Sequence, residues 1–161
     1  MSGLERLNAM PPEEAAAILL ACCGSSEWAR RMVARRPFAS PAAALDGADR
    51  VWKGLFPADW LEAFRAHPRI GEAGVQGSAA AEQAGTKAAP PEVLAALAQA
   101  NRAYEERFGH IFIVCASGKG AEEMLDLCRR RLDNEASTEL TVAAEEQRKI
   151  TRLRMEKLFT T

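Results

Sequence analysis

The stretch Glu92–Cys115, EVLAALAQANRAYEERFGHIFIVC, decides the fold class. Its first part keeps apolar residues on one helical face, which predicts an amphipathic helix from Glu92 to Phe108 that ends at Gly109. The run that follows, Ile111–Cys115, is short and apolar, and it is the only strand-like segment in the sequence. Because one such run cannot form a sheet, we expect it to be an extended, buried connector in an all-α protein.

Helical patterns cover the chain on both sides of this stretch. Acidic residues in a first turn, such as Glu13 and Glu14, and a hydroxyl cap followed by proline, as in Ser40-Pro41, mark where helices begin. Asp46-Gly47 is a weak point within one of these helices. The sequence therefore predicts one compact all-α domain over residues 1–161, with about seven or eight helices.

Composition excludes several classes of partner. The 161-residue chain has a formal net charge of −1, which gives no reason to expect nucleic acid or an anionic membrane as partner. No apolar run approaches the roughly 18 residues that a membrane span needs, and residues 1–10 lack the apolar core of a secretion signal. All cysteines lie in apolar patterns, so we expect reduced core thiols in a cytoplasmic protein. They are Cys22, Cys23, Cys115 and Cys128.

The segment Ala66–Glu72, AHPRIGE, holds one of the two histidines of the chain. Because the residue before a proline is disfavoured in the α region, the preceding helix should end at about His67. The imidazole would then lie at a helix end, on the face shared by Trp60 and Phe64, with Pro68 beside it. We expect a histidine that is desolvated by the core and faces a cavity.

Composition changes between Gly71 and Pro91, where glycine and alanine dominate, and this predicts a long loop. Long ordered loops are often functional, and the four glycines favour a lid that closes. If the loop folds over His67, Glu82 supplies a carboxylate beside the imidazole. Otherwise Glu82 is a solvated surface residue.

Arg154 lies in the last predicted helix, which should run to about Phe159. Turning about 100° per residue places Arg154 within roughly 40° of Ile150, in the middle of an apolar stripe. A buried arginine is costly unless it is paired. It could form a structural ion pair with a core carboxylate, or clamp an anion, since a planar guanidinium matches carboxylate and ureido groups.

Other motifs do not predict chemistry. His67 and His110 lack the spacing of a metal pair and no CxxC occurs, so we expect no metal site. Ser117–Gly120, SGKG, lacks the leading glycine and the Lys-Ser/Thr ending of a phosphate loop, and is interpreted as a turn with a helix cap. Cys115 with His110 could mimic a thiol–imidazole pair, but Cys115 ends an apolar run and is better explained by packing.

Five motifs occur in order along nearly the whole chain: HPRIG (67–71), EQ (82–83), NxxYExxFG (101–109), FIVCASG (112–118) and EEQxKIxxLR (145–154). Together they resemble the 2-oxo-4-hydroxy-4-carboxy-5-ureidoimidazoline (OHCU) decarboxylases of urate breakdown. The resemblance implies an all-helical homodimer that needs no metal or organic cofactor. It also implies a small-molecule substrate, OHCU, from which CO2 is removed to give (S)-allantoin.

The resemblance also assigns roles to residues. It implies that His67 is the catalytic acid/base and that Glu82 and Arg154 are the other catalytic and substrate-binding residues. Family members often carry a serine at the position of Ala79, so a hydroxyl contact from this segment is not expected here. The further substrate-binding positions that it implies are Pro68, Ala79, Gln83, Ile111, Phe112, Ile113, Val114 and Cys115.

Two other classes of protein remain open. A non-catalytic helical module that binds a ureide or purine would share the pocket and the arginine but could spare His67. A generic helical dimerisation domain would explain the apolar stripes but not a central Arg154. For the decarboxylase, we expect His67 to handle the proton of the substrate hydroxyl, Glu82 to hold ureido N–H groups, and Arg154 to bind a substrate oxygen.

Overall fold

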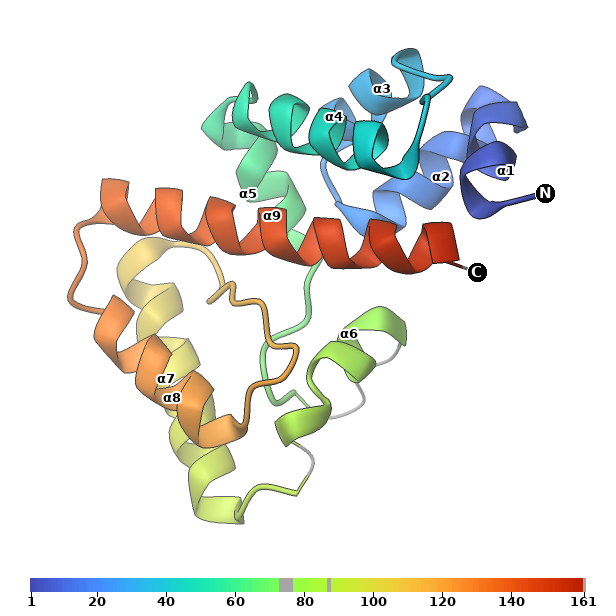
Figure 1. The fold of residues 1–161 in the computed structure, drawn as a ribbon. Helices are drawn as coiled ribbons and strands as arrows, with labels where there is room; N and C mark the ends of the chain where they lie inside the picture. The colour runs from blue at the N-terminus through green and yellow to red at the C-terminus, as the bar shows by residue number, and fades with distance from the viewer. Residues whose placement is uncertain (73–76, 87, 161) are drawn as a thin grey trace. The chain divides into compact units, whose positions relative to one another are not determined.

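The computed structural model describes residues 1–72, 77–86 and 88–160. These residues form nine α-helices and one short 3-10 helix, and none of them is in a β-strand. The elements are α1 (Gly3–Ala9), α2 (Pro12–Cys22), α3 (Ser26–Ala34), α4 (Pro41–Lys53), α5 (Pro57–Arg65), α6 (Gly77–Glu82), η1 (Ala84–Thr86), α7 (Pro91–Phe108), α8 (Ala121–Arg131) and α9 (Ala136–Thr160) (Figure 1). The prediction of an all-α protein is confirmed.

The contacts within the chain divide it into two compact units. The first unit comprises Met1–Ala63 and Gln147–Thr161, and the second comprises Phe64–Glu146. Helix α9 therefore contributes its first turns to the second unit and the rest of its length to the first. The prediction of a single domain over residues 1–161 stays a prediction.

Helix α4 shows how the first unit follows and departs from the sequence prediction. Ser40 caps it as predicted, because its Oγ accepts the N–H of Ala43 at 3.0 Å. Helix α4 runs without a break through Asp46-Gly47, the predicted weak point. Gly47 is buried, and the Phe38 ring lies 3.9 Å from the position that a Cβ would take there, so packing offsets the low helix propensity of glycine.

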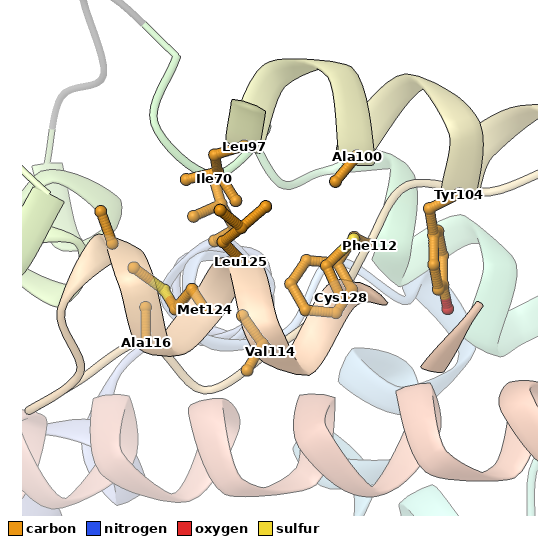
Figure 2. Close-up of a cluster of buried hydrophobic side chains, with 11 residues drawn as sticks. Ile70, Leu97, Ala100, Tyr104, Phe112, Val114, Ala116, Met124, Leu125 and Cys128 are labelled. Atoms are coloured by element: carbon orange, nitrogen blue, oxygen red, sulfur yellow. The ribbon is translucent and has the colours of Figure 1, made fainter. Parts of the chain in front are cut away.

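The core of the second unit joins α7 and α8 to the connector between them (Figure 2). Helix α7 ends where predicted, because Gly109 takes the left-handed conformation with φ 78°. The buried cluster consists of residues from both helices and from the connector, together with Ile70. Its members are Ile70, Leu97, Ala100, Tyr104, Phe112, Val114, Ala116, Ala121, Met124, Leu125 and Cys128. Packing against two helices accounts for a strand-like run without a sheet.

The segment from Gly71 to Pro91 is not one long loop, and that prediction is wrong. It contains α6 (Gly77–Glu82) and η1 (Ala84–Thr86). Three consecutive alanines at 79–81 have the highest helix propensity of any residue type, and this outweighs the neighbouring glycines. Part of the predicted lid, residues 73–76 and residue 87, lies outside the described residues.

Candidate functional site

His67 lies two residues after the end of α5, close to the helix end that the His-Pro motif predicts. Helix α5 ends at Arg65, and the N–H of His67 donates to the carbonyl oxygen of Phe64 at 3.2 Å. Phe64 is fully buried, whereas His67 and Pro68 are half-buried. The predicted position of the imidazole at the end of a helix is confirmed, and its catalytic role stays a prediction.

The loop that follows His67 is tied to α7. Arg69 makes a two-pronged ion pair with Glu105, with Nε–Oε2 and Nη2–Oε1 distances of 2.9 and 2.8 Å. Asn101 Nδ2 donates to the carbonyl oxygen of Ile70 at 3.0 Å, and this bond is buried. These contacts fix the backbone that leads away from the imidazole, and they come from the NxxYE motif.

The same loop is also tied to the α6–η1 segment, which we define as residues 77–86. The N–H of Gly71, whose φ of +80° favours glycine, donates to Gln83 Oε1 at 2.9 Å. Gln83 is 7% exposed, and its side-chain oxygen binds the protein backbone. The contact with substrate that the resemblance implies for Gln83 stays a prediction. Glu82 ends α6 and is half-buried, and Ala79 is half-buried one turn earlier.

The α6–η1 segment packs closely against the turn before α8 at Gly85. A Cβ on Gly85 would lie 2.1 Å from the carbonyl oxygen of Lys119, a distance that side-chain atoms do not tolerate. Only glycine therefore allows this approach, which brings residues next to Glu82 against the turn that follows the connector.

The connector, residues 111–116, alternates its side chains. Phe112, Val114 and Ala116 lie in the α7–α8 cluster, whereas Ile113 and Cys115 are buried outside that cluster. Successive side chains of an extended backbone point to opposite faces. The predicted extended, buried connector is confirmed by this alternation.

Side chains hydrogen-bond the peptide groups of Ile113 and Cys115, which lie on one edge of the connector. Ile113 O accepts from Arg131 Nη1 at 2.7 Å. Cys115 N donates to Glu146 Oε1 at 3.1 Å, and Cys115 O accepts from Lys119 Nζ at 2.8 Å. In the described part of the chain, no hydrogen bond involves the peptide N–H or C=O of Phe112 or Val114. We call the peptide groups of these two residues the open edge.

Buried peptide groups are almost always paired, because an unpaired one loses its hydration without compensation. Phe112 and Val114 are 2% and 4% exposed. The open edge thus presents two donors and two acceptors in a buried setting, which is suited to a small ligand that carries amide-like groups.

Charges gather around Cys115 at the end of the connector. Burial raises the pKa of its thiol; the Lys119 ammonium opposes this effect, while the Glu146 and Glu82 carboxylates add to it. Glu82 therefore lies near enough to the connector to act on it electrostatically. A thiol with a raised pKa is a poor nucleophile, which agrees with packing as the explanation of Cys115.

A buried polar network that no sequence motif predicted lies at the other edge of the connector. Arg131 Nε donates to Glu139 Oε1 at 2.6 Å, and the hydroxyl of Tyr104 donates to the same carboxylate oxygen. Tyr104 and Glu139 are 0% exposed, and burial together with this hydrogen bond raises the pKa of Tyr104, which stays a donor. The three-residue step from Cys128 to Arg131 on the inward face of α8 was the available signal.

Arg154 belongs to the first unit. It is half-buried, and its Nη1 donates to the carbonyl oxygen of Ala21 at 3.3 Å. Its role as an ion-pair partner or an anion clamp stays a prediction. Its charge partly opposes the effect of burial, which raises the pKa of Cys22 to about 11 and that of Cys23 to about 12. The fully buried charge of α9 is Glu139 instead.

A hollow of about 490 Å³ is lined by the loop after His67 and by α7. Its described lining contains none of the residues that the sequence predicts to bind substrate. The lining consists of Arg69, Ile70, Gly71, Glu72, Leu94, Ala98, Asn101, Arg102, Glu105 and Glu106. Across residues 1–72, 77–86 and 88–160, no three His, Cys, Asp or Glu side chains are grouped to hold a metal ion. Nor does any helix there have the length and apolar character of a membrane span.

Known proteins are similar to this chain in sequence and in fold. The chain is 40% identical over 146 residues to the uric acid degradation bifunctional protein TTL of Arabidopsis thaliana, which covers 86% of this chain and 45% of that protein. It is 29% identical over 160 residues to the 2-oxo-4-hydroxy-4-carboxy-5-ureidoimidazoline decarboxylase of Haloferax volcanii, covering 97% of this chain and 95% of that one. The chain spans less than half the length of the bifunctional relatives, 45% and 32% for the first two.

A solved structure extends the similarity to three dimensions. The crystal structure of an OHCU decarboxylase in the presence of (S)-allantoin matches with a TM-score of 0.82 and 38% identity, over 94% of this chain and 100% of that chain. The sequence profile of the OHCU decarboxylase family matches residues 8–156. This match covers most of the chain, and the chain belongs to the OHCU decarboxylase family.

Proposed function

We propose that this protein decarboxylates OHCU to (S)-allantoin. The observation that carries the proposal is the open edge of the connector, where the peptide groups of Phe112 and Val114 are buried and unpaired among the described residues. OHCU is a ring with oxo and ureido substituents, and these groups offer the N–H donors and carbonyl acceptors that such an edge would pair. Membership of the family supports the same substrate.

The reaction breaks the bond between the ring carbon and the carboxylate. CO2 leaves, the electron pair stays in the ring system, and a proton is then added to give one enantiomer. We propose that His67 accepts the proton of the substrate hydroxyl. His67 is half-buried near the end of α5, and its backbone N–H binds the carbonyl oxygen of the fully buried Phe64. Placing a donor or acceptor where charge develops is the strongest contribution a cofactor-independent site can make.

Glu82 and Arg154 complete the proposed set. The Glu82 carboxylate would accept ureido N–H groups, and its electrostatic effect on Cys115 supports a position near the connector. Arg154 would bind a carbonyl or carboxylate oxygen, a role that rests on the EEQxKIxxLR motif. The side chain of Gln83 is assigned to holding Gly71, and Ala79 and Pro68 to shaping the site.

The assay that tests this function starts from freshly formed OHCU, made from urate by the two preceding enzymes, and follows circular dichroism. We expect rapid formation of optically active allantoin with the wild type. His67→Ala should fold normally, because His67 follows the last turn of α5, yet should lose this activity. If the wild type gives only slow formation of racemic allantoin, the decarboxylase is excluded and a ureide-binding module is favoured.

Three further properties are part of the proposal. We expect a homodimer, on the family resemblance, and analytical ultracentrifugation checks it. We expect a cytoplasmic protein, which the four buried, unpaired cysteines support. We expect activity without an added metal or organic cofactor, which dialysis against a chelator followed by the same assay checks.

A further inference from the structure

We propose that Arg131 is a positioning residue of the substrate site. Together with Glu139 and Tyr104 it fixes the connector so that the peptide groups of Phe112 and Val114 face the substrate. The inference rests on the proposed function, and it concerns three side chains to which the family resemblance gave no role.

The contacts of Arg131 reach both a carboxylate and the connector. Arg131 is 8% exposed at the end of α8. Its Nε donates to Glu139 Oε1 at 2.6 Å, while its Nη1 donates to Ile113 O at 2.7 Å. The same carboxylate accepts from the Tyr104 hydroxyl, and its other oxygen accepts from Asn134 Nδ2 at 3.0 Å. The planar guanidinium is thereby locked in orientation.

Arg131 also touches the residue before Ile113. Its guanidinium carbon lies 4.6 Å from the centre of the Phe112 ring, a cation–π distance. In an extended backbone, the N–H and C=O of one residue point to one side and those of the next residue point to the other. Fixing Ile113 O toward Arg131 therefore turns the peptide groups of Phe112 and Val114 to the opposite side.

Stability alone does not explain this network. A buried ion pair loses the hydration of two charges, and apolar side chains of similar volume often stabilise a fold at least as well. Glu139 is fully buried, and Arg131 nearly so. What apolar side chains could not provide is the hydrogen bond to Ile113 O, which sets the orientation of the connector.

The test removes the network without leaving a charge unpaired. The triple variant Tyr104→Phe, Arg131→Met, Glu139→Leu should fold with a thermal midpoint close to that of the wild type. We expect its KM for OHCU to rise about tenfold, the effect of one misplaced hydrogen bond, with a smaller change in kcat. A folded triple variant with wild-type KM and kcat would overturn the inference.

The adjacent residue provides a matched control. Arg130 forms an exposed pair with Asp126 on the same helix, at 2.7 Å and with both side chains about two-thirds exposed. Arg130→Met removes an arginine one position away without touching the connector. We expect its KM and kcat to equal those of the wild type, and a tenfold rise in KM in this variant too would count against a specific role for Arg131.

A second variant keeps the inference testable if the triple variant does not fold. Arg131→Lys retains a positive charge for Glu139, but an ammonium lacks the planar fork that reaches the carboxylate and Ile113 O together. We expect KM to rise in this variant as well. We also expect (S)-allantoin to protect the amide hydrogens of Phe112 and Val114 from exchange less strongly than it does in the wild type. Wild-type KM and protection in a folded Arg131→Lys would overturn the inference.

Binding of (S)-allantoin separates this inference from the proposed function. If the wild type binds (S)-allantoin but does not turn over OHCU, the proposed function fails and the inference is tested by affinity alone. We then expect Kd for (S)-allantoin to rise about tenfold in Arg131→Lys. An unchanged Kd overturns the inference, and a wild type that neither binds nor reacts overturns both.

Discussion

The connector and the α6–η1 segment both carry proposed substrate contacts in the second unit, but they are held in different ways. Residues 112–116 of the connector are all buried, and side chains from α8 and α9 bind its backbone. The α6–η1 segment is mostly half-buried or exposed, and it is tied down by the Gln83–Gly71 hydrogen bond and the close approach of Gly85 to Lys119.

This difference separates a pre-organised surface from an adjustable one. A peptide edge that is fixed before the ligand arrives loses little conformational entropy on binding. An element with few buried contacts opens at low free-energy cost, as substrate entry requires. We therefore expect loss of one charged partner that anchors the connector to appear first in stability, and damage to the α6–η1 segment to appear first in catalysis.

The largest effect should follow Arg131→Met alone, which leaves the buried Glu139 carboxylate without its cation. Breaking a buried ion pair in this way costs about 3–5 kcal/mol of unfolding free energy. Urea denaturation checks this value against Arg130→Met, whose exposed pair should contribute less than about 1 kcal/mol. Equal losses in the two variants would contradict an anchored connector.

A smaller effect should follow Gly85→Ala. Its Cβ would lie 2.1 Å from Lys119 O, so the α6–η1 segment must shift, at a cost of about 1–3 kcal/mol. We expect kcat/KM to fall about tenfold or more, because Glu82 moves with the segment. Gly120→Ala is the matched control, since a Cβ at Gly120 meets no atom within 4 Å. Loss of activity in both variants would indicate a general effect on the turn.

Gln83→Leu should cost about 1–2 kcal/mol, because it leaves the Gly71 N–H without its acceptor. Of the contacts that tie the loop after His67 to other elements, those with α7 would then remain. We expect the loss of kcat, expressed as free energy, to exceed the loss of unfolding free energy. Gln83→Glu keeps an acceptor at the same place and should recover most of the rate. If Gln83→Glu is as slow as Gln83→Leu, the amide itself contacts the substrate.

The smallest effect should follow Cys115→Ala, since the connector is proposed to act through its backbone. We expect kcat and KM within about threefold of the wild type. Burial raises the pKa of this thiol, so the stability that it contributes is complete below the ordinary thiol pKa and is lost as the pH rises through the folded-state pKa. Cys115→Ala should therefore weaken the alkaline loss of stability, which urea denaturation at a series of pH values measures.

Local signals in the sequence were sufficient for the main features of this comparison. The spacing in α7, the apolar run of the connector and the His-Pro helix end were predicted correctly, because each depends on residues within a few positions. Helix α6 departs from the predicted loop because the helix propensity of Ala79–Ala81 outweighs the effect of the glycines on either side.

Long-range partners account for what could not be predicted. Glu139 and Arg131 are buried because they meet each other, Tyr104 and Ile113, and no local pattern specifies that meeting. The same limit explains Arg154: helical periodicity placed it in an apolar stripe, yet it lies half-buried with a hydrogen bond to Ala21, 133 positions earlier. The open edge could not be predicted either, because it is defined by which peptide groups of the connector form hydrogen bonds with the rest of the unit.

A crystal structure of this chain with (S)-allantoin tests the central claim most directly. We predict that ring or ureido groups of the ligand hydrogen-bond the peptide groups of Phe112 and Val114 at about 3 Å, while Ile113 O keeps its bond to Arg131. A ligand bound elsewhere, such as in the hollow beside Arg69, with the open edge unoccupied, would contradict the account.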